Sequence, residues 1–117
     1  MPHDQKQMHE CMQHCWEARH ECQSVLFNHC IEVGGAHVAA PHLRIMADCI
    51  QACQTAADFM VRGSQFSASE CAACAEICDA CAESCERIGG KEMKRCAEMC
   101  HRCAESCRKM SGMQKAA

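Results

Sequence analysis

The sequence predicts an all-α protein, an antiparallel four-helix bundle whose helices run up, down, up and down. Three breaks that contain glycine divide the chain into four segments, at 32–41, 61–70 and 87–91. Within each segment, cysteine, alanine and methionine recur at steps of three and four, the spacing of one helix face. Short connections make consecutive helices antiparallel neighbours. We therefore expect a single four-helix-bundle domain over residues 1–117.

The first two predicted helices lie near 4–33 and 40–62. The first should end before the glycine pair in "EVGGAHVAAP", because glycine is the residue most often found just past a helix. Pro41 suits the first turn of the second helix, where its missing N–H has no helical partner to lose. The first break is thus a turn between two antiparallel helices.

The other two predicted helices lie near 67–88 and 91–110. Ser67 and Glu70 have the spacing of a capping box, which starts a helix. The glycine pair in "RIGGK" separates this helix from the last one. Strand signals are scarce throughout the chain, so all regular structure should be helical.

Composition and charge exclude several classes of protein. The net charge of the 117 residues is -3, which gives no electrostatic footprint for nucleic acid or an anionic membrane surface. No run approaches the roughly 18 apolar residues of a membrane-spanning helix. The start, "MPHDQKQMHECMQHC", lacks the apolar stretch of a secretory signal. We expect a cytoplasmic protein with neither nucleic-acid nor membrane partners.

Cysteine is the unusual component of the chain. There are 15 cysteines, against 14 leucine, isoleucine, valine and phenylalanine residues combined. Cysteine and alanine must therefore fill much of the core, and a protonated thiol does behave as a small buried hydrophobe. Because cytoplasmic thiols stay reduced, metal ligation is the better interpretation than disulfide bonding.

The cysteines follow one face of every predicted helix, at alternating steps of three and four. Fourteen of them lie on these faces, which makes them candidate metal ligands: Cys11, Cys15, Cys22, Cys49, Cys53, Cys71, Cys74, Cys78, Cys81, Cys85, Cys96, Cys100, Cys103 and Cys107. Cys30 lies beside the face of the first helix. It is also a candidate ligand, although the spacing alone leaves open that it lies just off the core.

Folding the third helix onto the fourth pairs their cysteines. The predicted pairs are Cys85 with Cys96, Cys81 with Cys100, Cys78 with Cys103, and Cys74 with Cys107. In the first hairpin only Cys22 and Cys49 face each other, because Ala18 and Ala56 take places opposite other cysteines. The half of the core built from the third and fourth helices should therefore be richer in thiols.

A continuous row of thiols on four facing helices predicts an array of metal ions, not one closed site. Thiolate ligands favour Cu(I), Zn(II) or an iron–sulfur cluster. Four thiolates around Zn(II) leave a charge of −2, whereas equal numbers of Cu(I) and thiolate cancel, and uncompensated charge is costly in a core. Iron–sulfur clusters usually use loop motifs that this chain lacks. We therefore expect multiple Cu(I) ions per chain.

The stretch "CAACAEICDACAESCERIGGKEMKRCAEMCHRCAESC" resembles the bacterial cytosolic copper storage proteins. In it, C-x2-C-x3-C-x2-C-x3-C on one helix is answered by C-x3-C-x2-C-x3-C on the next, and the resemblance spans almost the whole chain. It implies a four-helix bundle that binds many Cu(I) ions, forms homotetramers and has no enzymatic activity. Several relatives have a cysteine near the start of the fourth helix, where this chain has Met93.

The two ends of the predicted bundle differ. His42, Met46 and Met93 lie at the end that holds the first and third loops, where imidazole and thioether groups would bind Cu(I) more weakly than thiolates and so suit a transient entrance. His29 lies on the face of the first helix at the same end. The opposite end collects residues that should form an apolar plug: Met8, Phe59, Met60, Phe66 and Met110.

The predicted function is cytosolic copper storage or sequestration. An enzyme is not expected, because a catalytic nucleophile requires one activated thiol in a cleft. Two alternatives remain open, a zinc or mixed-metal thiol buffer and a disulfide-stapled helical scaffold. Besides copper ions, the expected partners are further copies of the chain and a copper chaperone that delivers the metal.

Overall fold

The computed structural model describes residues 2–116, with side chains described from 5 to 112. No strand occurs within residues 2–116, and every element is helical. A membrane crossing would need a longer apolar run than any helix in this range provides. The elements are α1 (Pro2–Val25), the π-helix η1 (Leu26–Cys30), α2 (Ile31–Val33), the 3-10 helix η2 (Gly35–Val38), α3 (Ala40–Val61), α4 (Ser67–Ile88) and α5 (Lys91–Ala116).

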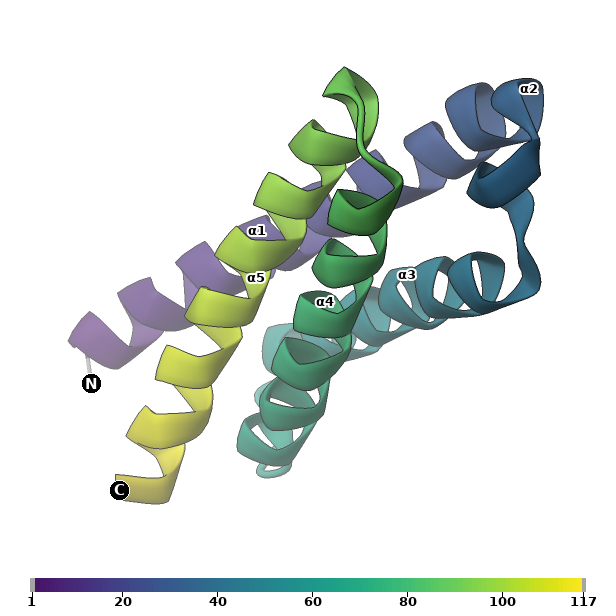
Figure 1. The fold of residues 1–117 in the computed structure, drawn as a ribbon. Helices are drawn as coiled ribbons and strands as arrows, with labels where there is room; N and C mark the ends of the chain where they lie inside the picture. Colours follow the sequence, from purple (N-terminus) through teal and green to yellow (C-terminus); the bar gives the residue numbers. More distant parts are fainter. Residues whose placement is uncertain (1, 117) are drawn as a thin grey trace.

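The four long helices form an antiparallel bundle, which confirms the predicted fold class. Helix α1 packs against α3 and α5, and α4 packs against the same two helices, so the four surround one core. The bundle measures 47 × 21 × 19 Å. In Figure 1 the hairpin of α4 and α5 lies across α1 and α3, and the two termini are at the same end of the molecule. The opposite end carries the two glycine-pair turns.

Glycine ends the helices where the sequence predicts. Gly34 has φ of +75° and Gly89 of +80°, a region that residues with a side chain rarely adopt. The Gly89 N–H donates to the Cys85 carbonyl at 3.0 Å, which satisfies one of the last carbonyls of α4. The bounds of α3 and α4 agree with the prediction to within a residue, while α5 continues past the predicted end near 110 to Ala116.

The predicted capping box is wrong. Phe66 takes the N-cap position of α4 without a side-chain hydrogen bond, and Ser67 lies inside the helix, fully buried. The Ser67 hydroxyl donates to the Ser64 carbonyl at 2.9 Å, and the Ser64 hydroxyl accepts from the Phe66 N–H at 3.0 Å. Hydrogen bonds within the loop thus replace the cap, because serine bonds to nearby backbone groups as readily as to a helix terminus.

A π-helical turn interrupts the first predicted helix and changes which residues face the core. Residues Leu26–Cys30 form this turn, which accommodates one residue more than an α-helical turn. An extra residue rotates the chain by roughly 100° relative to a regular helix. Cys30, which the spacing placed beside the core face, is fully buried, and His29, which the spacing placed on that face, is only partly buried. The sequence-based position of His29 is therefore wrong.

Thiols, alanine methyl groups and methionine thioethers fill the core. All 15 cysteines are buried and free, with at most 1% of any of them exposed. Val25 and Leu26 are the only branched aliphatic side chains among the buried residues of the described part of the chain. The prediction that cysteine and alanine replace the usual aliphatic core is confirmed.

Candidate metal centre

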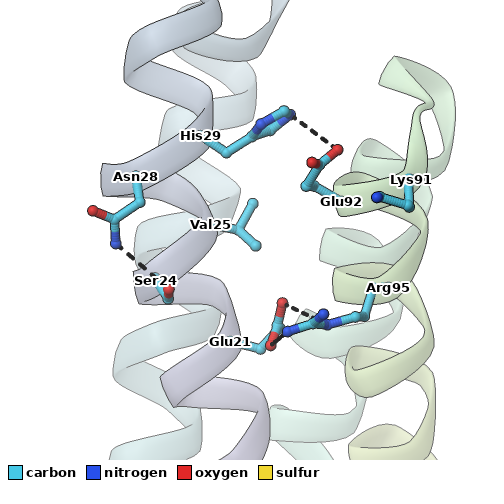
Figure 2. Close-up of a pocket in the computed structure, with 8 residues that line it drawn as sticks. All are labelled: Glu21, Ser24, Val25, Asn28, His29, Lys91, Glu92 and Arg95. Carbon is cyan, nitrogen blue, oxygen red and sulfur yellow. Dashed lines mark hydrogen bonds and ion pairs between the residues drawn. The ribbon is translucent and has the colours of Figure 1, made fainter.

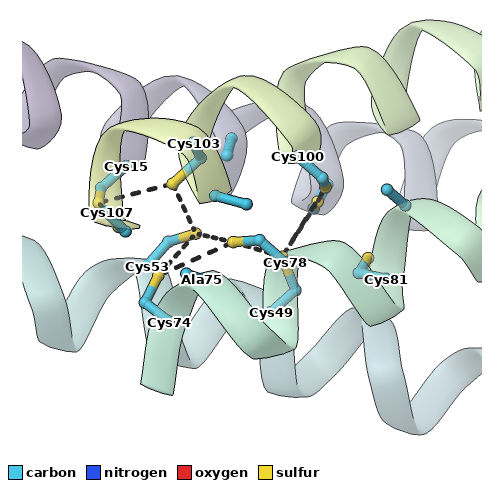
Figure 3. Close-up of a cluster of buried hydrophobic side chains, with 14 of the residues drawn as sticks. Cys15, Cys49, Cys53, Cys74, Ala75, Cys78, Cys81, Cys100, Cys103 and Cys107 are labelled. Carbon is cyan, nitrogen blue, oxygen red and sulfur yellow. Dashed lines mark hydrogen bonds between the residues drawn. The ribbon is translucent and has the colours of Figure 1, made fainter. Parts of the chain in front are cut away.

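The cysteine sulfur atoms form a column along the bundle, with sulfurs from different helices facing one another (Figure 3). The shortest Sγ–Sγ distance, 3.4 Å, joins Cys22 of α1 to Cys100 of α5. Cys53 of α3 lies 3.5 Å from Cys78 of α4. Steps of three and four keep the cysteines of each helix on one face, so all four helices supply sulfur to the same column.

Four groups within the column could each hold a metal ion, because all the Sγ atoms in a group lie within 4.8 Å of one another. The groups are Cys15, Cys74, Cys103 and Cys107; Cys22, Cys49, Cys81 and Cys100; Cys53, Cys74, Cys78 and Cys103; and Cys11, Cys71 and Cys107. Cys74, Cys103 and Cys107 each belong to two groups. A thiolate shared in this way can bridge two ions, so the arrangement fits a continuous array and not isolated sites.

The structure brings together the cysteines that the hairpin geometry paired. Three of the four predicted pairs of α4 and α5 fall within the groups described above. The fourth pair, Cys85 with Cys96, lies outside these groups, although both thiols are fully buried. In the other half, Cys22 Sγ lies 3.9 Å from Cys49 Sγ, as expected.

At the end that carries the glycine-pair turns, called here the mouth, three different donors converge. His42 is 4% exposed, and its Nε2 lies 3.9 Å from Cys30 Sγ. The Cys30 thiol also contacts Met93 Sδ at 3.8 Å. His42 Nδ1 and Ser84 Oγ are hydrogen-bonded at 2.8 Å, which fixes the ring with Nε2 toward Cys30. The mouth therefore combines thiol, thioether and imidazole.

The sequence identified His42 and Met93 but not the positions of Cys30 and Ser84. Cys30 reaches the mouth through the π-helical turn, and "LFNHC" contains no glycine or proline to signal it. Ser84 directly precedes Cys85 in α4 and belongs to no sequence motif. Only the packing of α3 against α4 shows that it orients His42.

Met46 lies between the mouth and the thiol column. It is fully buried, and its Sδ receives the Cys81 thiol at 3.5 Å and the Cys85 thiol at 3.7 Å. Met46 thus lies next to the last two cysteines of α4. A metal ion bound to Met46 Sδ would therefore lie next to the Cys81 and Cys85 thiols of the column.

His29 lies outside the column, beside a surface cleft of about 530 Å³ between the end of α1 and the start of α5 (Figure 2). Its Nε2 is 4.0 Å from Glu92 Oε1. Below it, Arg95 Nε lies 3.4 Å from Glu21 Oε2. His29 therefore faces Glu92 at the surface and not the column, whereas His42 faces Cys30.

The end opposite the mouth is only partly the predicted plug. Met60 and Met110 are buried, with 1% and 2% exposed, and Met8 is partly buried against the core. Phe66, however, is 58% exposed. Its assignment to the plug is therefore wrong.

The core provides no protein cation to balance a thiolate. Among residues 5–112, no lysine or arginine is buried. Burial raises the pKa of the Cys30 thiol, so that thiol is neutral at pH 7 without a metal ion. Burial lowers the pKa of His42, which keeps its imidazole neutral and able to bind a metal. Loss of the Cys30 proton is therefore coupled to the arrival of a metal ion.

These features define a class of protein, a four-helix bundle that holds soft metal ions in a core of thiols. The sequence model of the copper storage proteins matches residues 4–112. The chain belongs to the copper storage protein family, and the resemblance noted from its cysteine spacing is confirmed.

Solved structures agree in fold with this chain. A protein from Nitrosospira multiformis is 46% identical, with a TM-score of 0.88 over 92% of this chain and 97% of that one. The Cu(I)-bound copper storage protein BsCsp3 is 30% identical, with a TM-score of 0.83 over 90% of this chain and 98% of its own. The apo form of copper storage protein 3 from Bacillus subtilis is 31% identical, with a TM-score of 0.79 over 88% and 97%. No curated protein matches the chain in sequence.

Proposed function

We propose that this chain stores Cu(I) in its core as an array of ions bridged by thiolates. The sharing of Cys74, Cys103 and Cys107 between groups of ligands carries the proposal, because bridging lets each sulfur serve two ions. Charge balance supports the choice of metal, since Cu(I) and thiolate cancel in a core without buried lysine or arginine. The 30% identical relative is a Cu(I)-bound protein, which supports the same choice.

The proposed ligands are all 15 cysteines, with His42, Met46 and Met93 at the mouth. Neutralising every thiolate requires about one Cu(I) per cysteine. Copper would arrive at His42, Cys30 and Met93, then pass Met46 on its way to Cys81 and Cys85. Two sets of distances support this order: 3.8–3.9 Å from Cys30 to Met93 and His42 within the mouth, and 3.5–3.7 Å from Met46 to Cys81 and Cys85.

A titration of the reduced protein with Cu(I) under anaerobic conditions, against a chelator of known affinity, tests the proposal. We expect saturation well above four ions per chain, with the thiols losing their reactivity as copper binds. Saturation at about four ions or fewer would contradict storage. A parallel titration with Zn(II) provides the control, because the group Cys22, Cys49, Cys81 and Cys100 could hold one zinc ion with a sulfur from every helix.

We further propose that the protein acts in the cytoplasm, as a homotetramer loaded by a copper chaperone, and catalyses no reaction. The free thiols support a reducing compartment. Phe27 and Ile31 lie one turn apart with more than half of each side chain exposed, which supports contact with another copy. Sedimentation equilibrium of the Cu(I)-loaded protein measures the oligomeric state directly, and a monomer at micromolar concentration would contradict this proposal.

A further inference from the structure

The end opposite the mouth contains a layer of four sulfur atoms, one from each long helix. Cys11 of α1, Cys71 of α4 and Cys107 of α5 have their Sγ atoms within 4.8 Å of one another. Cys11 Sγ and Cys107 Sγ are 3.6 Å apart. Met60 of α3 completes the layer, with its Sδ 3.7 Å from Cys71 Sγ. At most 1% of Cys11, Cys71, Cys107 or Met60 is exposed.

This layer resembles a layer of four thiols, except that one of its four sulfur atoms belongs to a thioether. In the group Cys22, Cys49, Cys81 and Cys100, each helix also supplies one sulfur, and α3 supplies the thiol of Cys49. At the far end, α3 supplies the thioether of Met60 instead. Both layers thus present four soft donors to the bundle axis, but the terminal layer can carry one negative charge fewer.

The position of the layer gives a physical reason for the thioether. A thiolate inside the column can bridge ions on both sides, whereas a fourth thiolate in the last layer would have metal ions on one side only. The bundle buries no lysine or arginine within residues 5–112 that could balance its excess charge. A thioether is soft enough to bind Cu(I), is neutral and has no proton to lose, so it completes coordination without adding charge.

We propose that Met60 is a copper ligand and that, with Cys11, Cys71 and Cys107, it forms a terminal site for a single Cu(I) ion. The site is linked to the rest of the array through Cys107, which also belongs to the group Cys15, Cys74 and Cys103. This inference rests on the proposed storage of Cu(I). On this proposal the far end is the last metal-binding site of the column and not an apolar plug.

The first test compares Met60→Leu with Met110→Leu. Both methionines lie at this end and are almost fully buried, but among the described side chains only Met60 Sδ accepts a hydrogen bond from a thiol there. Exchange of methionine for leucine keeps volume and apolarity and costs less than about 1.5 kcal/mol, so both variants should fold. We expect Met60→Leu to weaken binding of one Cu(I) per chain by at least roughly tenfold in competition with a chelator. Met110→Leu should retain the copper of the unmodified chain, and equal retention by both variants would contradict the proposal.

The second test uses the unmodified full-length chain labelled with 13C at the methionine methyl groups. Cu(I) is diamagnetic, so the methyl signal of Met60, assigned by its absence in Met60→Leu, can be followed by NMR during loading. We expect this signal to shift far more than that of Met110 as the last equivalents bind. A chain that loads to capacity while the Met60 signal stays in place would overturn the terminal site alone. A chain that binds no Cu(I) at all would overturn the storage proposal and this site with it.

Discussion

Each cysteine of the column is an apolar core residue while it is protonated and a metal ligand once it loses its proton. Burial raises the pKa of the Cys30 thiol, and burial together with the Cys81 and Cys96 thiols raises that of Cys85. Without metal these thiols are therefore neutral and pack as small hydrophobic groups. The same residues can thus stabilise the empty bundle and bind metal without any change of fold.

The raised thiol pKa values predict how the stability of the reduced, metal-free protein depends on pH. The folded chain keeps these thiols protonated where an unfolded chain ionises them, so their contribution is complete below about pH 8.5 and is lost as the pH rises above it. Urea unfolding followed by circular dichroism should give a constant free energy of unfolding from pH 6.5 to 8 and a lower one at pH 9.5. The Cu(I)-loaded protein, whose thiolates are already formed, is the control and should show no such loss. Equal stability of the metal-free chain at pH 7 and 9.5 would contradict the pKa shifts.

At the scale of single helices, α4 and α5 carry most of the sulfur. They supply nine of the cysteines, and the three thiols shared between groups all belong to them. Alanine occupies places such as Ala18 and Ala56 in α1 and α3, so these helices contribute fewer donors. The π-helical turn then adds Cys30 at the end of the first hairpin, where it meets α3 and α5.

Replacing thiols of α4 and α5 should therefore remove more copper than replacing those of α1 and α3. The first variant changes Cys74, Cys78, Cys103 and Cys107 to serine, and the matched variant changes Cys11, Cys15, Cys49 and Cys53. We expect the first to lose roughly twice as many Cu(I) ions, because its shared thiols would bridge neighbouring ions. Copper retained after gel filtration measures this difference, with circular dichroism to verify that both variants are helical. Equal losses would show that the shared positions do not act as bridges.

At the scale of the whole molecule, the two ends of the column differ in chemistry. The mouth offers an imidazole and two thioethers next to thiols, whereas the far end offers the single thioether of Met60, which contacts the Cys71 thiol. Weaker donors at an opening favour rapid exchange of the ion. Copper should therefore enter and leave through the mouth.

Changing Met46 and Met93 together to leucine tests this direction. The change keeps volume and apolarity at a cost below about 1.5 kcal/mol per site. We expect slower loading from a Cu(I) donor and slower removal by a chelator, both followed by stopped-flow absorbance, with total capacity nearly unchanged. Met8→Leu with Met110→Leu at the other end is the control. If the control slows loading and the mouth variant does not, copper enters at the opposite end.

The sequence by itself determined the fold class, the helix ends at the glycine pairs and the face of each helix that carries thiols. These features are local, because helical periodicity and the conformational freedom of glycine act over a few residues. The pairing of Cys81 with Cys100 also followed, since a short turn between antiparallel helices fixes their register. Cysteine spacing was therefore sufficient to identify a bundle with a metal-binding core.

Only the tertiary structure decided which of His29 and Cys30 faces the core, how Ser67 is bonded and which sulfur meets Met60. The π-helical turn shifts the register by one residue, and no residue type in that segment requires it. The choice between an α and a π turn depends on the packing of η1 against α3 and α5, where the buried Cys30 contacts His42 and Met93. Such contacts join residues far apart in the chain, so the spacing within a single helix cannot specify them.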